Sequence, residues 1–432
     1  MKEVSTARAK APPKLFYGWV VTFATAVSYF LIAGARQGGF GNFLKPISTE
    51  FGWSRALTAG AASLGSVESA IQGPILGILV DRLGSRLIMW LGFAIGAAGL
   101  VVLGFINSLA LFYLVYVVMV PLGLGAVQLA GQTVVAHWFI KRRSRALSII
   151  TVGFSLGGAF LTPAIGWMVS NYGWRSTSVV MGIVMGVVGL SVVSLVKNDP
   201  EKYGYSPDGS PQSKPAEPDK QEGSAKNRAS EEVDFSLRQA LKTSSFWLLV
   251  LAMSLSGLAT SAVSVHAIPL LTDKGFSAQA AANFVGLSFL WGVVGRVMWG
   301  FLGDYVAKRY LLAVAVVVMG TGIVFLATST HTFEIYLYSF LYGIGQGVVP
   351  VQFAIRAEYF GRKAFGSIAG VMTAFTTVGG LIGPIYAGFV YDHAGSYRTA
   401  LLVVALACLV SCVLFWFARR PVPPISTELS MV

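Results

Sequence analysis

The sequence contains little charge and many apolar residues. Only 12% of its 432 residues are Asp, Glu, Lys or Arg, and 55% are hydrophobic. Soluble globular domains carry about twice this share of charged residues. Apolar stretches of about 20 residues recur along the chain, and each is long enough to cross a hydrocarbon core about 30 Å thick as a helix. The sequence therefore predicts an all-α membrane protein.

Several chemical signatures are missing. The two cysteines, Cys408 and Cys412, lie one helical turn apart in the last apolar stretch and are interpreted as packing residues. The phosphate-binding pattern Gly-x-x-x-x-Gly-Lys-Ser/Thr is absent, which argues against an ATP-driven activity. Metal-ligand spacings, His-Glu-x-x-His and a convincing Gly-x-Ser-x-Gly are absent as well. No cofactor, no metal and no enzymatic activity are expected.

Polar or Gly/Pro-marked turns divide the chain into twelve apolar segments. The polar start at residues 1–14 runs directly into the first of them without a short, leader-like stretch, so we expect this segment to stay in the membrane. The segments are 16–43, 56–80, 87–107, 109–136, 146–170, 176–196, 244–271, 279–303, 310–329, 333–355, 365–391 and 399–418.

The net charge of +13 follows from where the basic residues fall. They concentrate in alternate connections, on the side that also holds both termini, and basic residues of membrane proteins accumulate on the cytoplasmic side. We therefore expect a multi-pass protein of a cell (inner) membrane, with both termini cytoplasmic, that acts as a monomer in contact with lipid and binds no nucleic acid. The residues assigned to cytoplasmic connections include Arg82, Arg86, Lys141, Arg142, Arg143, Arg145, Lys308, Arg309, Arg356, Arg362 and Lys363.

A polar segment divides the chain in two. Residues 197–243 are rich in Pro, Ser, Gly and mixed charge, and cannot bury enough apolar surface to offset the entropy of ordering. We expect a flexible cytoplasmic linker here. The predicted organisation is a tail at 1–15, a six-helix bundle at 16–196, the linker at 197–243, a second six-helix bundle at 244–418 and a tail at 419–432.

The two halves repeat one another at a nearly constant offset. The stretch "GILVDRLGSR" at 77–86 matches "GFLGDYVAKR" at 300–309, which is 223 residues later, and Arg175 matches Arg398 at the same offset. Repeats of the same orientation in transporters are related by an axis along the membrane normal, and the binding site lies between them. The sequence therefore predicts two pseudo-symmetric bundles with a cavity at their interface.

The stretch at 77–86 resembles a signature of the major facilitator superfamily, G-x-x-x-D-R-x-G-R-K/R, found between the second and third helices. Gly77 matches the close-contact glycine, Asp81 the carboxylate and Arg86 a basic position. A glycine lets two helices touch, and a carboxylate at a helix end interacts with basic groups or with a facing helix N-terminus. The resemblance implies a conformational latch in both halves, with the members Gly77, Asp81, Arg82, Arg86, Gly300, Asp304 and Arg309.

Within that superfamily the chain is similar to the oxalate/formate antiporter and monocarboxylate transporter branches. The stretches that carry the resemblance are "YGWVV" at 17–21, "FLKPISTEFGWSRA" at 43–56 and "HWFIKRRSRALSIITVGFSLGG" at 137–158, together with Arg296 in the eighth segment. The resemblance covers both halves. It implies secondary transport of a small carboxylate by alternating access, with protons as the coupling ion.

Arg296 is the main candidate for substrate binding. It precedes Asp304 by eight residues, or about 12 Å of helix, which places it near the middle of the hydrocarbon core. A charge at that depth costs at least about 2.5 kcal/mol and therefore indicates a functional site. The repeat has Gly73 at the matching position, so packing alone does not demand arginine. The guanidinium fork suits a carboxylate, and the resemblance implies this role, with a structural ion pair as the alternative.

Two departures from those branches affect the predicted substrate and its coupling. Where monocarboxylate transporters have an aspartate one turn before the arginine, this sequence has Gly292, which leaves the usual proton-coupling residue missing. The oxalate transporters add a lysine in the eleventh helix, and residues 365–391 contain none. Two negative charges in a low-dielectric cavity need a second cation. The missing lysine therefore favours a monocarboxylate, such as lactate or pyruvate, over a dianion.

Two further charges lie inside apolar segments. Glu68 is about 20 Å from the cytoplasmic end of the second segment, and a carboxylate at that depth is suited to carrying a transported proton. Its alternative is a structural partner for a hydroxyl or for Arg36. Arg36, late in the first segment, corresponds inexactly to a lysine of monocarboxylate transporters, and it is either a substrate ligand or an interfacial residue.

Other side chains in the apolar segments are candidates for the cavity wall. His266 either donates to a carboxylate, carries the proton in place of Glu68, or only packs. The further wall candidates are Gln128, Phe154, Phe375 and Tyr386, with core packing as the alternative for the aromatic residues. The remaining amides in apolar segments are Gln72, Gln132, Asn283, Gln346 and Gln352.

The sequence thus favours a twelve-helix secondary transporter that moves a small monocarboxylate, with proton symport. An organic-anion exchanger of the oxalate/formate type remains an alternative. A proton-coupled drug exporter is suggested by "GGAFLTPAIG" at 157–166, although a central arginine disfavours a cationic substrate. A carboxylate sensor that does not transport is a third alternative, disfavoured because the linker contains no recognisable output domain.

Overall fold

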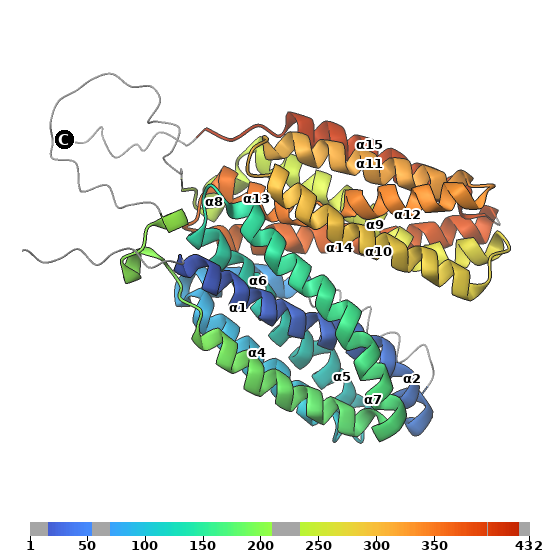
Figure 1. Ribbon diagram of the computed structural model, residues 1–432, viewed down its shortest axis with the longest axis horizontal. Coiled ribbons are helices and arrows are strands. Elements are labelled where there is room, and N and C mark those ends of the chain that lie inside the picture. The colour runs from blue at the N-terminus through green and yellow to red at the C-terminus, as the bar shows by residue number, and fades with distance from the viewer. Residues whose placement is uncertain (1–15, 54–69, 210–233, 395, 423–432) are drawn as a thin grey trace, which may run out of the picture.

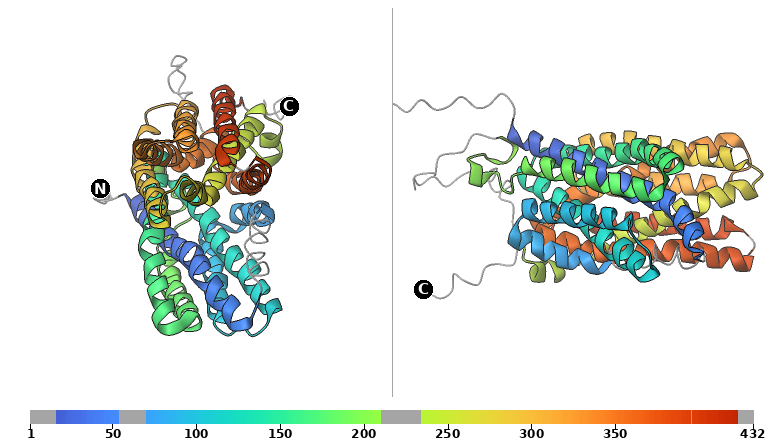
Figure 2. Two further views of the ribbon diagram at one scale, coloured as in Figure 1. Left: turned by 90° about the vertical axis from the view of Figure 1, so that its right-hand side faces the viewer. Right: turned by 90° about the horizontal axis from the view of Figure 1, so that it is seen from below.

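The computed structural model describes residues 16–53, 70–209, 234–394 and 396–422, and within these ranges it contains helices and no strand. Helices α1 to α7 form one bundle and helices α9 to α15 form the other, and the two converge at one end and diverge toward the other (Figure 1). In the end-on view of Figure 2 the bundles lie side by side.

The first bundle contains a continuous helical run at its start and a very long helix at its end. Its elements are α1 (Tyr17–Ala33), the π-helical η1 (Gly34–Gly39), α2 (Phe40–Phe51), a helix at 70–83, α4 (Ser85–Leu103), α5 (Leu109–Tyr113), the π-helical η2 (Leu114–Met119), α6 (Val120–Trp138) and α7 (Arg143–Ser194).

The second bundle follows two short 3-10 turns, η3 (Glu201–Tyr203) and η4 (Pro207–Gly209), and the short helix α8 (Leu237–Leu241). Its elements are α9 (Ser244–Asp273), α10 (Ala278–Leu302), α11 (Lys308–Thr328), α12 (Thr332–Gln346), α13 (Val349–Phe360), α14 (Phe365–Ala394) and α15 (Tyr397–Phe417).

These helices give the twelve spans that the sequence predicts. Nine of the described helices are long and apolar enough to cross a membrane. One of them, α7, has 52 residues and contains two spans, because Gly173 breaks it with a φ of +78°, a backbone conformation that favours glycine. The pair α12 and α13 makes up a further span, and the helix at 70–83 is the described part of the segment expected at 56–80. The all-α membrane fold in two bundles is confirmed.

Matching glycines make matching helix crossings in the two halves. A Cβ built on Gly157 of α7 would lie 2.1 Å from the carbonyl oxygen of Phe30 on α1. A Cβ built on Gly379 of α14 would lie 2.4 Å from the carbonyl oxygen of Ser254 on α9. Backbones can approach this closely only where no side chain intervenes. The sequence repeat therefore corresponds to the same helix crossing in each bundle, α1 with α7 and α9 with α14.

Both described ends of the segment 197–243 are folded, which differs from the expected flexible linker. The Asp208 carboxylate accepts hydrogen bonds from the backbone N–H groups of residues 140–142 at 3.0, 2.7 and 3.2 Å. The Asp234 carboxylate accepts bonds from the N–H groups of residues 362–363 at 2.8 and 3.1 Å. Successive backbone N–H groups form a concave site for an anion, and each aspartate fills one. Each end of the segment is thereby fixed to an equivalent loop, one in each bundle.

Arg356 lies inside the second bundle, not in a loop. The apolar segment expected at 333–355 ends one residue before it, but α12 and α13 continue to Phe360. Only 4% of Arg356 is exposed to solvent. Its assignment to a cytoplasmic connection is therefore wrong.

The end at which the bundles converge is called the basic end, because it carries Arg82, Lys141, Arg309 and Lys363 at its helix ends and loops. At this end the halves touch through paired glycines. A Cβ on Gly77 would lie 2.3 Å from the carbonyl oxygen of Gly366. A Cβ on Gly370, one turn further into the membrane, would lie 2.1 Å from the carbonyl oxygen of Gly73.

A methyl group at Gly77 is expected to push the halves apart at the basic end. Its Cβ would overlap backbone atoms of α14 that cannot move alone, and overpacking of this kind costs about 1 to 3 kcal/mol. Gly77→Ala should lengthen the distance between spin labels at Leu83 and Lys363, measured by pulsed electron resonance on a parent in which serine replaces both cysteines.

The matched control is Gly286→Ala on α10, since no heavy atom lies within 4 Å of a Cβ built there. An unchanged label distance in Gly77→Ala, or the same change in both variants, would contradict this account of the contact.

Candidate functional site

A cavity of about 920 Å³ lies between the two bundles. The first half contributes Arg36 of η1, the helix at 70–83 and α6, and the second half contributes α9, α10, α12, α13 and α14. A cavity of this size suits a small organic ligand. Its position between the halves is the one that the sequence repeat predicts.

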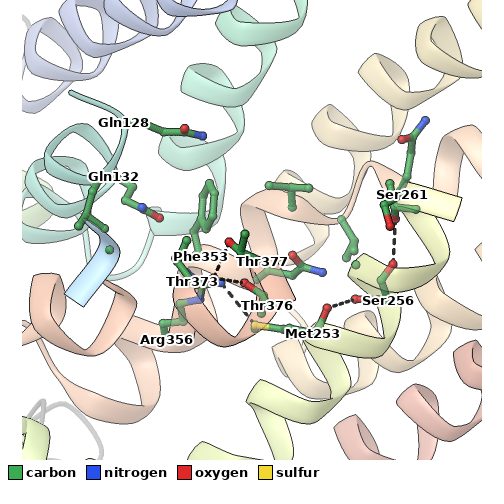
Figure 3. A pocket seen from close by; sticks show the side chains of 18 of the residues that line it. Gln128, Gln132, Met253, Ser256, Ser261, Phe353, Arg356, Thr373, Thr376 and Thr377 are labelled. Atoms are coloured by element: carbon green, nitrogen blue, oxygen red, sulfur yellow. Dashed lines mark hydrogen bonds between the residues drawn. The ribbon is translucent and has the colours of Figure 1, made fainter. Parts of the chain in front are cut away.

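The wall of the second half is polar along one face of each helix. Ser256 and Thr260 of α9 line the cavity at helical spacing. Thr373 and Thr377 of α14 do so as well, and Figure 3 shows them together with Ser256. Ser256 and Thr260 donate to carbonyl oxygens of the preceding turn at 3.0 and 2.9 Å. Their hydroxyl hydrogens are thus used within the helix, and the α9 and α14 faces of the wall are polar without carrying charge.

The charged side chains of the wall are all cationic. Arg36, Arg296 and Arg356 line the cavity, and the described lining residues include no aspartate or glutamate. Charges of one sign in a cleft with low-dielectric walls raise the local concentration of the opposite charge. The cavity is therefore built for an anion.

Arg296 lies on α10 at the interface of the two bundles. Its backbone carbonyl accepts a hydrogen bond from Ser148 Oγ of α7 at 2.7 Å, while its side chain lines the cavity. The guanidinium makes no hydrogen bond or ion pair with any residue in the described ranges. The structural ion pair that was the alternative for Arg296 therefore has no partner among those residues.

Gly292 leaves room for the Arg296 guanidinium one turn earlier on the same helix. A Cβ on Gly292 would lie 3.2 Å from Arg296 Nη1 and 3.5 Å from Gln346 Nε2. The side-chain amide nitrogen of Gln346 is buried and has no hydrogen-bond partner. Two sets of N–H donors, from Arg296 and Gln346, thus meet beside the glycine that replaces the expected aspartate.

Arg356 is a second guanidinium on the wall, and the sequence-based candidates do not include it. It lies beside Phe353 and Met253 in Figure 3, with its guanidinium carbon 5.5 Å from the centre of the Phe353 ring. Its Nη2 contacts Met253 Sδ at 3.5 Å. Its Nε and Nη1 are buried without a hydrogen-bond partner.

Arg36 and Gln128 contact one another across the first half of the wall. Arg36 Nη1 donates to Gln128 Oε1 at 3.3 Å, and both residues line the cavity. Four further amides found in apolar segments line it as well, namely Gln72, Gln132, Gln346 and Gln352. These amides could be found from the sequence, because a polar side chain inside an apolar segment is unusual.

Four of the other candidates lie away from the cavity. His266 Nε2 is 3.0 Å from the carbonyl oxygen of Pro384, and its ring packs on Tyr397. Phe154 and Tyr386 pack against the cores of the first and second halves, and Phe375 packs on Trp247. Glu68 lies outside the described residues.

The basic end of the cavity is closed by two reciprocal contacts, in which an aspartate of one half meets the N-terminus of a helix in the other half. In the first, Asp81 accepts hydrogen bonds from the backbone N–H groups of Gly366 and Ser367 at 2.8 and 2.7 Å, and from the Ser367 hydroxyl. These donors begin α14, where the unpaired N–H groups and the helix dipole favour a negative charge.

In the second contact, Asp304 meets the start of α7. It accepts a hydrogen bond from the backbone N–H of Ser144 at 3.1 Å and forms an ion pair with Arg145. Burial raises the pKa of Asp304, and the pairing with Arg145 offsets part of that shift. Gly300 and Gly303 lie against Ser148 and Ser144, as the latch motif implies.

The three basic members of the expected latch take no part in these contacts. Arg82 is exposed. Arg86 bonds within the first half, through its N–H to Asn198 Oδ1 at 2.7 Å and through Nη2 to the carbonyl of Ser194 at 3.1 Å. Arg309 donates to the hydroxyl of its neighbour Tyr310 at 2.6 Å.

A third contact across the basic end centres on His137 of α6. Its Nδ1 is 3.0 Å from Asp199 Oδ1, its Nε2 is 2.9 Å from the carbonyl oxygen of Arg362, and Arg362 Nη1 donates to the His137 carbonyl at 2.9 Å. The bonds from His137 and Lys202 hold the pKa of Asp199 well below its ordinary value. This contact lies in the aqueous layer beyond the glycine pairs and reinforces the closure.

Comparison with known proteins identifies relatives over almost the whole chain. The family model described as Major Facilitator Superfamily matches residues 19–349 and, in a second match, residues 267–430. Monocarboxylate transporter 13 of Rattus norvegicus is 24% identical over 404 residues, which cover 93% of this chain and 88% of the relative. The uncharacterized MFS-type transporter YcxA of Bacillus subtilis is 23% identical over 413 residues, which cover 91% of this chain and 92% of the relative.

The crystal structure of an E. coli fucose:proton symporter variant superposes with a TM-score of 0.72 at 19% identity, over 94% of this chain and all of that one, and shares the fold.

Asp81→Asn is expected to loosen the closure of the basic end. The amide retains the shape of the carboxylate but loses charge-assisted bonds to α14 that are worth about 1.5 to 3 kcal/mol. A cysteine at Thr373, one turn above the Gly370 contact, reports the opening. Its labelling by a membrane-impermeant reagent applied at the basic end should rise about 10- to 150-fold.

Asp273→Asn serves as the matched control, because Asp273 is exposed at the far end of α9. Equal labelling in the Asp81 variant and in its parent would show that the carboxylate does not hold the halves together.

Proposed function

We propose that the chain, which belongs to the Major Facilitator Superfamily, moves a small monocarboxylate such as lactate or pyruvate across the membrane by alternating access. The family and the matched relatives are membrane transporters, so the chain is a multi-pass transporter and not an enzyme. The observation that carries the proposal is Arg296, a cavity-facing guanidinium without a partner among the described residues.

Arg296 and Gln346 supply the donors that a carboxylate needs. The guanidinium presents two parallel N–H groups, and the amide of Gln346 beside it has an unused donor. Charge-assisted hydrogen bonds of this kind are strong where water is scarce. The carboxylate end of the acid binds here, and its short carbon chain lies against the uncharged part of the wall.

The two reciprocal contacts at the basic end can form and break as the cavity opens to one side of the membrane and then to the other. Each pairs a carboxylate with a helix N-terminus of the other half, and water can replace such a bond when the halves rock apart. In the proposed orientation the basic end is cytoplasmic, in keeping with the excess of basic residues there, and the protein acts as a monomer in a cell (inner) membrane. The described arrangement is then the state that is open to the outside.

Proton symport is the proposed coupling. Several matched relatives are named monocarboxylate transporters, and an anion that enters with one proton moves without net charge. Among the described residues the cavity wall has no carboxylate, so Glu68 is kept as the proton-carrying candidate.

Arg296→Ala is expected to abolish uptake. Truncating one partner of a buried charged pair costs about 2 to 5 kcal/mol, so uptake of labelled lactate, pyruvate, formate and acetate into liposomes should fall about 30-fold or more. Arg296→Lys, which retains the charge without the fork, should retain part of the activity.

Arg238→Gln is the control, since Arg238 is exposed on α8. Uptake by Arg296→Ala at the rate of the parent would overturn the assignment. A parent that binds these acids but shows no uptake would instead be a sensor.

The coupling is tested by following pH during uptake. If symport is correct, lactate uptake into liposomes that contain a pH-sensitive dye should acidify the interior with about one proton per lactate, because the carboxylate cannot cross with an uncompensated charge. Glu68→Gln should abolish the acidification. Counterflow of lactate without any pH change would favour exchange over symport.

A further inference from the structure

Arg356 is buried without the partners that a buried cation needs. It is 4% exposed, and among the described residues its Nε and Nη1 have no hydrogen-bond partner and its Nη2 contacts only a thioether sulfur, which is a weak acceptor. A charge taken out of water is tolerated where another charge or a set of hydrogen bonds compensates it. Arg356 also lines the cavity, so a ligand bound there can supply such compensation.

Arg143 shows how this protein stabilises an arginine whose role is structural. It is 2% exposed, even less than Arg356. Its Nε donates to the carbonyl of Phe139 at 2.9 Å, and its Nη2 donates to the carbonyl of Ala136 at 3.1 Å. Among the described residues Arg356 has no carbonyl acceptor of this kind, so backbone acceptors do not compensate the burial of its charge.

The repeat shows that packing does not require an arginine at this position. Tyr359 and Phe360 follow Arg356 as Trp138 and Phe139 follow Val135, at an offset of 221 residues. Val135 is completely buried in the first half. The fold therefore accommodates an apolar side chain at the equivalent point, and the positive charge is particular to the wall of the second half.

Arg296 and Arg356 lie at a similar depth in one cavity. The Arg296 side chain extends toward Gly292, which is ten residues or about 15 Å from the end of α10 at the basic end. Arg356 contacts Met253, which is nine residues or about 14 Å from the start of α9 at that end. The two guanidinium groups therefore face the same layer of the cavity from α10 and α13.

We propose that Arg356 is a second carboxylate-binding residue and that the cavity binds small dicarboxylates more tightly than monocarboxylates. The inference rests on the proposed function, because Arg296 takes the first carboxylate. The second cation that a dianion needs is thus present on α13, although the eleventh helix has no lysine. One molecule with a carboxylate at each end satisfies both guanidinium groups at once.

The first test compares binding of acids to the purified full-length protein by calorimetry. Oxalate, malonate, succinate and glutarate are set against acetate, propionate and butyrate, so that the chain length at which preference appears reports the spacing of the two sites. At least one dicarboxylate should bind about tenfold or more tightly than the monocarboxylate of the same length. Arg356→Gln should remove this preference and weaken monocarboxylate binding less than Arg296→Gln does, whereas Arg296→Gln should weaken binding of both classes of acid.

The second test needs no variant and therefore does not depend on folding of Arg356→Gln. The preferred dicarboxylate is compared with its monomethyl ester, which retains the shape but lacks the second charge. The ester should bind about tenfold more weakly to the parent. Met253→Leu is the control variant, since it removes the sulfur contact and leaves the charge.

The outcomes separate this proposal from the proposed function. Equal binding of diacid and ester, or a preference that survives in Arg356→Gln, would overturn the role of Arg356. If Arg296→Gln binds no acid and Arg356→Gln binds all acids as the parent does, the role of Arg356 is wrong and the proposed monocarboxylate function stands.

Discussion

The arrangement of the two halves depends on one interaction made twice. Asp81 of the first half binds the start of α14, and Asp304 of the second half binds the start of α7. A helix N-terminus offers backbone donors and the positive end of its dipole, so the attraction needs no dedicated basic residue, although Arg145 adds one to the second contact. The glycine pairs allow this approach, because any side chain in their place would hold the helices apart. The cavity exists because these contacts hold the halves together at one end and leave them apart at the other.

Charges of opposite sign are kept apart along the membrane normal. The acids of the interface lie at the basic end, where they bind helix N-termini, while the described wall of the cavity carries arginines and no acid. Gly292 is essential to this separation, since an acidic side chain there would contact Arg296 directly. An incoming anion thus meets guanidinium groups whose charge is not already neutralised by the described wall.

The sequence predicts the fold and the closure better than it predicts the cavity wall. Asp81 and Asp304 follow from a repeat that holds its register, and Arg296 follows because a charge in an apolar run is rare. The same reasoning does not find Arg356, because it lies near the end of α13. A charge near the end of an apolar segment is taken as the boundary of that segment, so the residue is assigned to the following loop. Phe154, a candidate for the cavity wall, packs instead against the core of the first half. A helix between neighbours is apolar on several faces, so periodicity does not tell which face meets the cavity.

The two aspartates at the ends of the central segment have a consequence for how the protein is built. Asp208 is bonded to the first half and Asp234 to the second, so each anchor belongs to its own bundle. The join between the bundles is confined to the residues between the anchors. The first hydrophobic core also includes Phe365 and Ala369 of the second half, so a chain cut there would leave each fragment with its own anchored loop and a core that the two fragments share. The two halves therefore share packing as well as hydrogen bonds at the basic end, and reassembly of such fragments depends on those contacts.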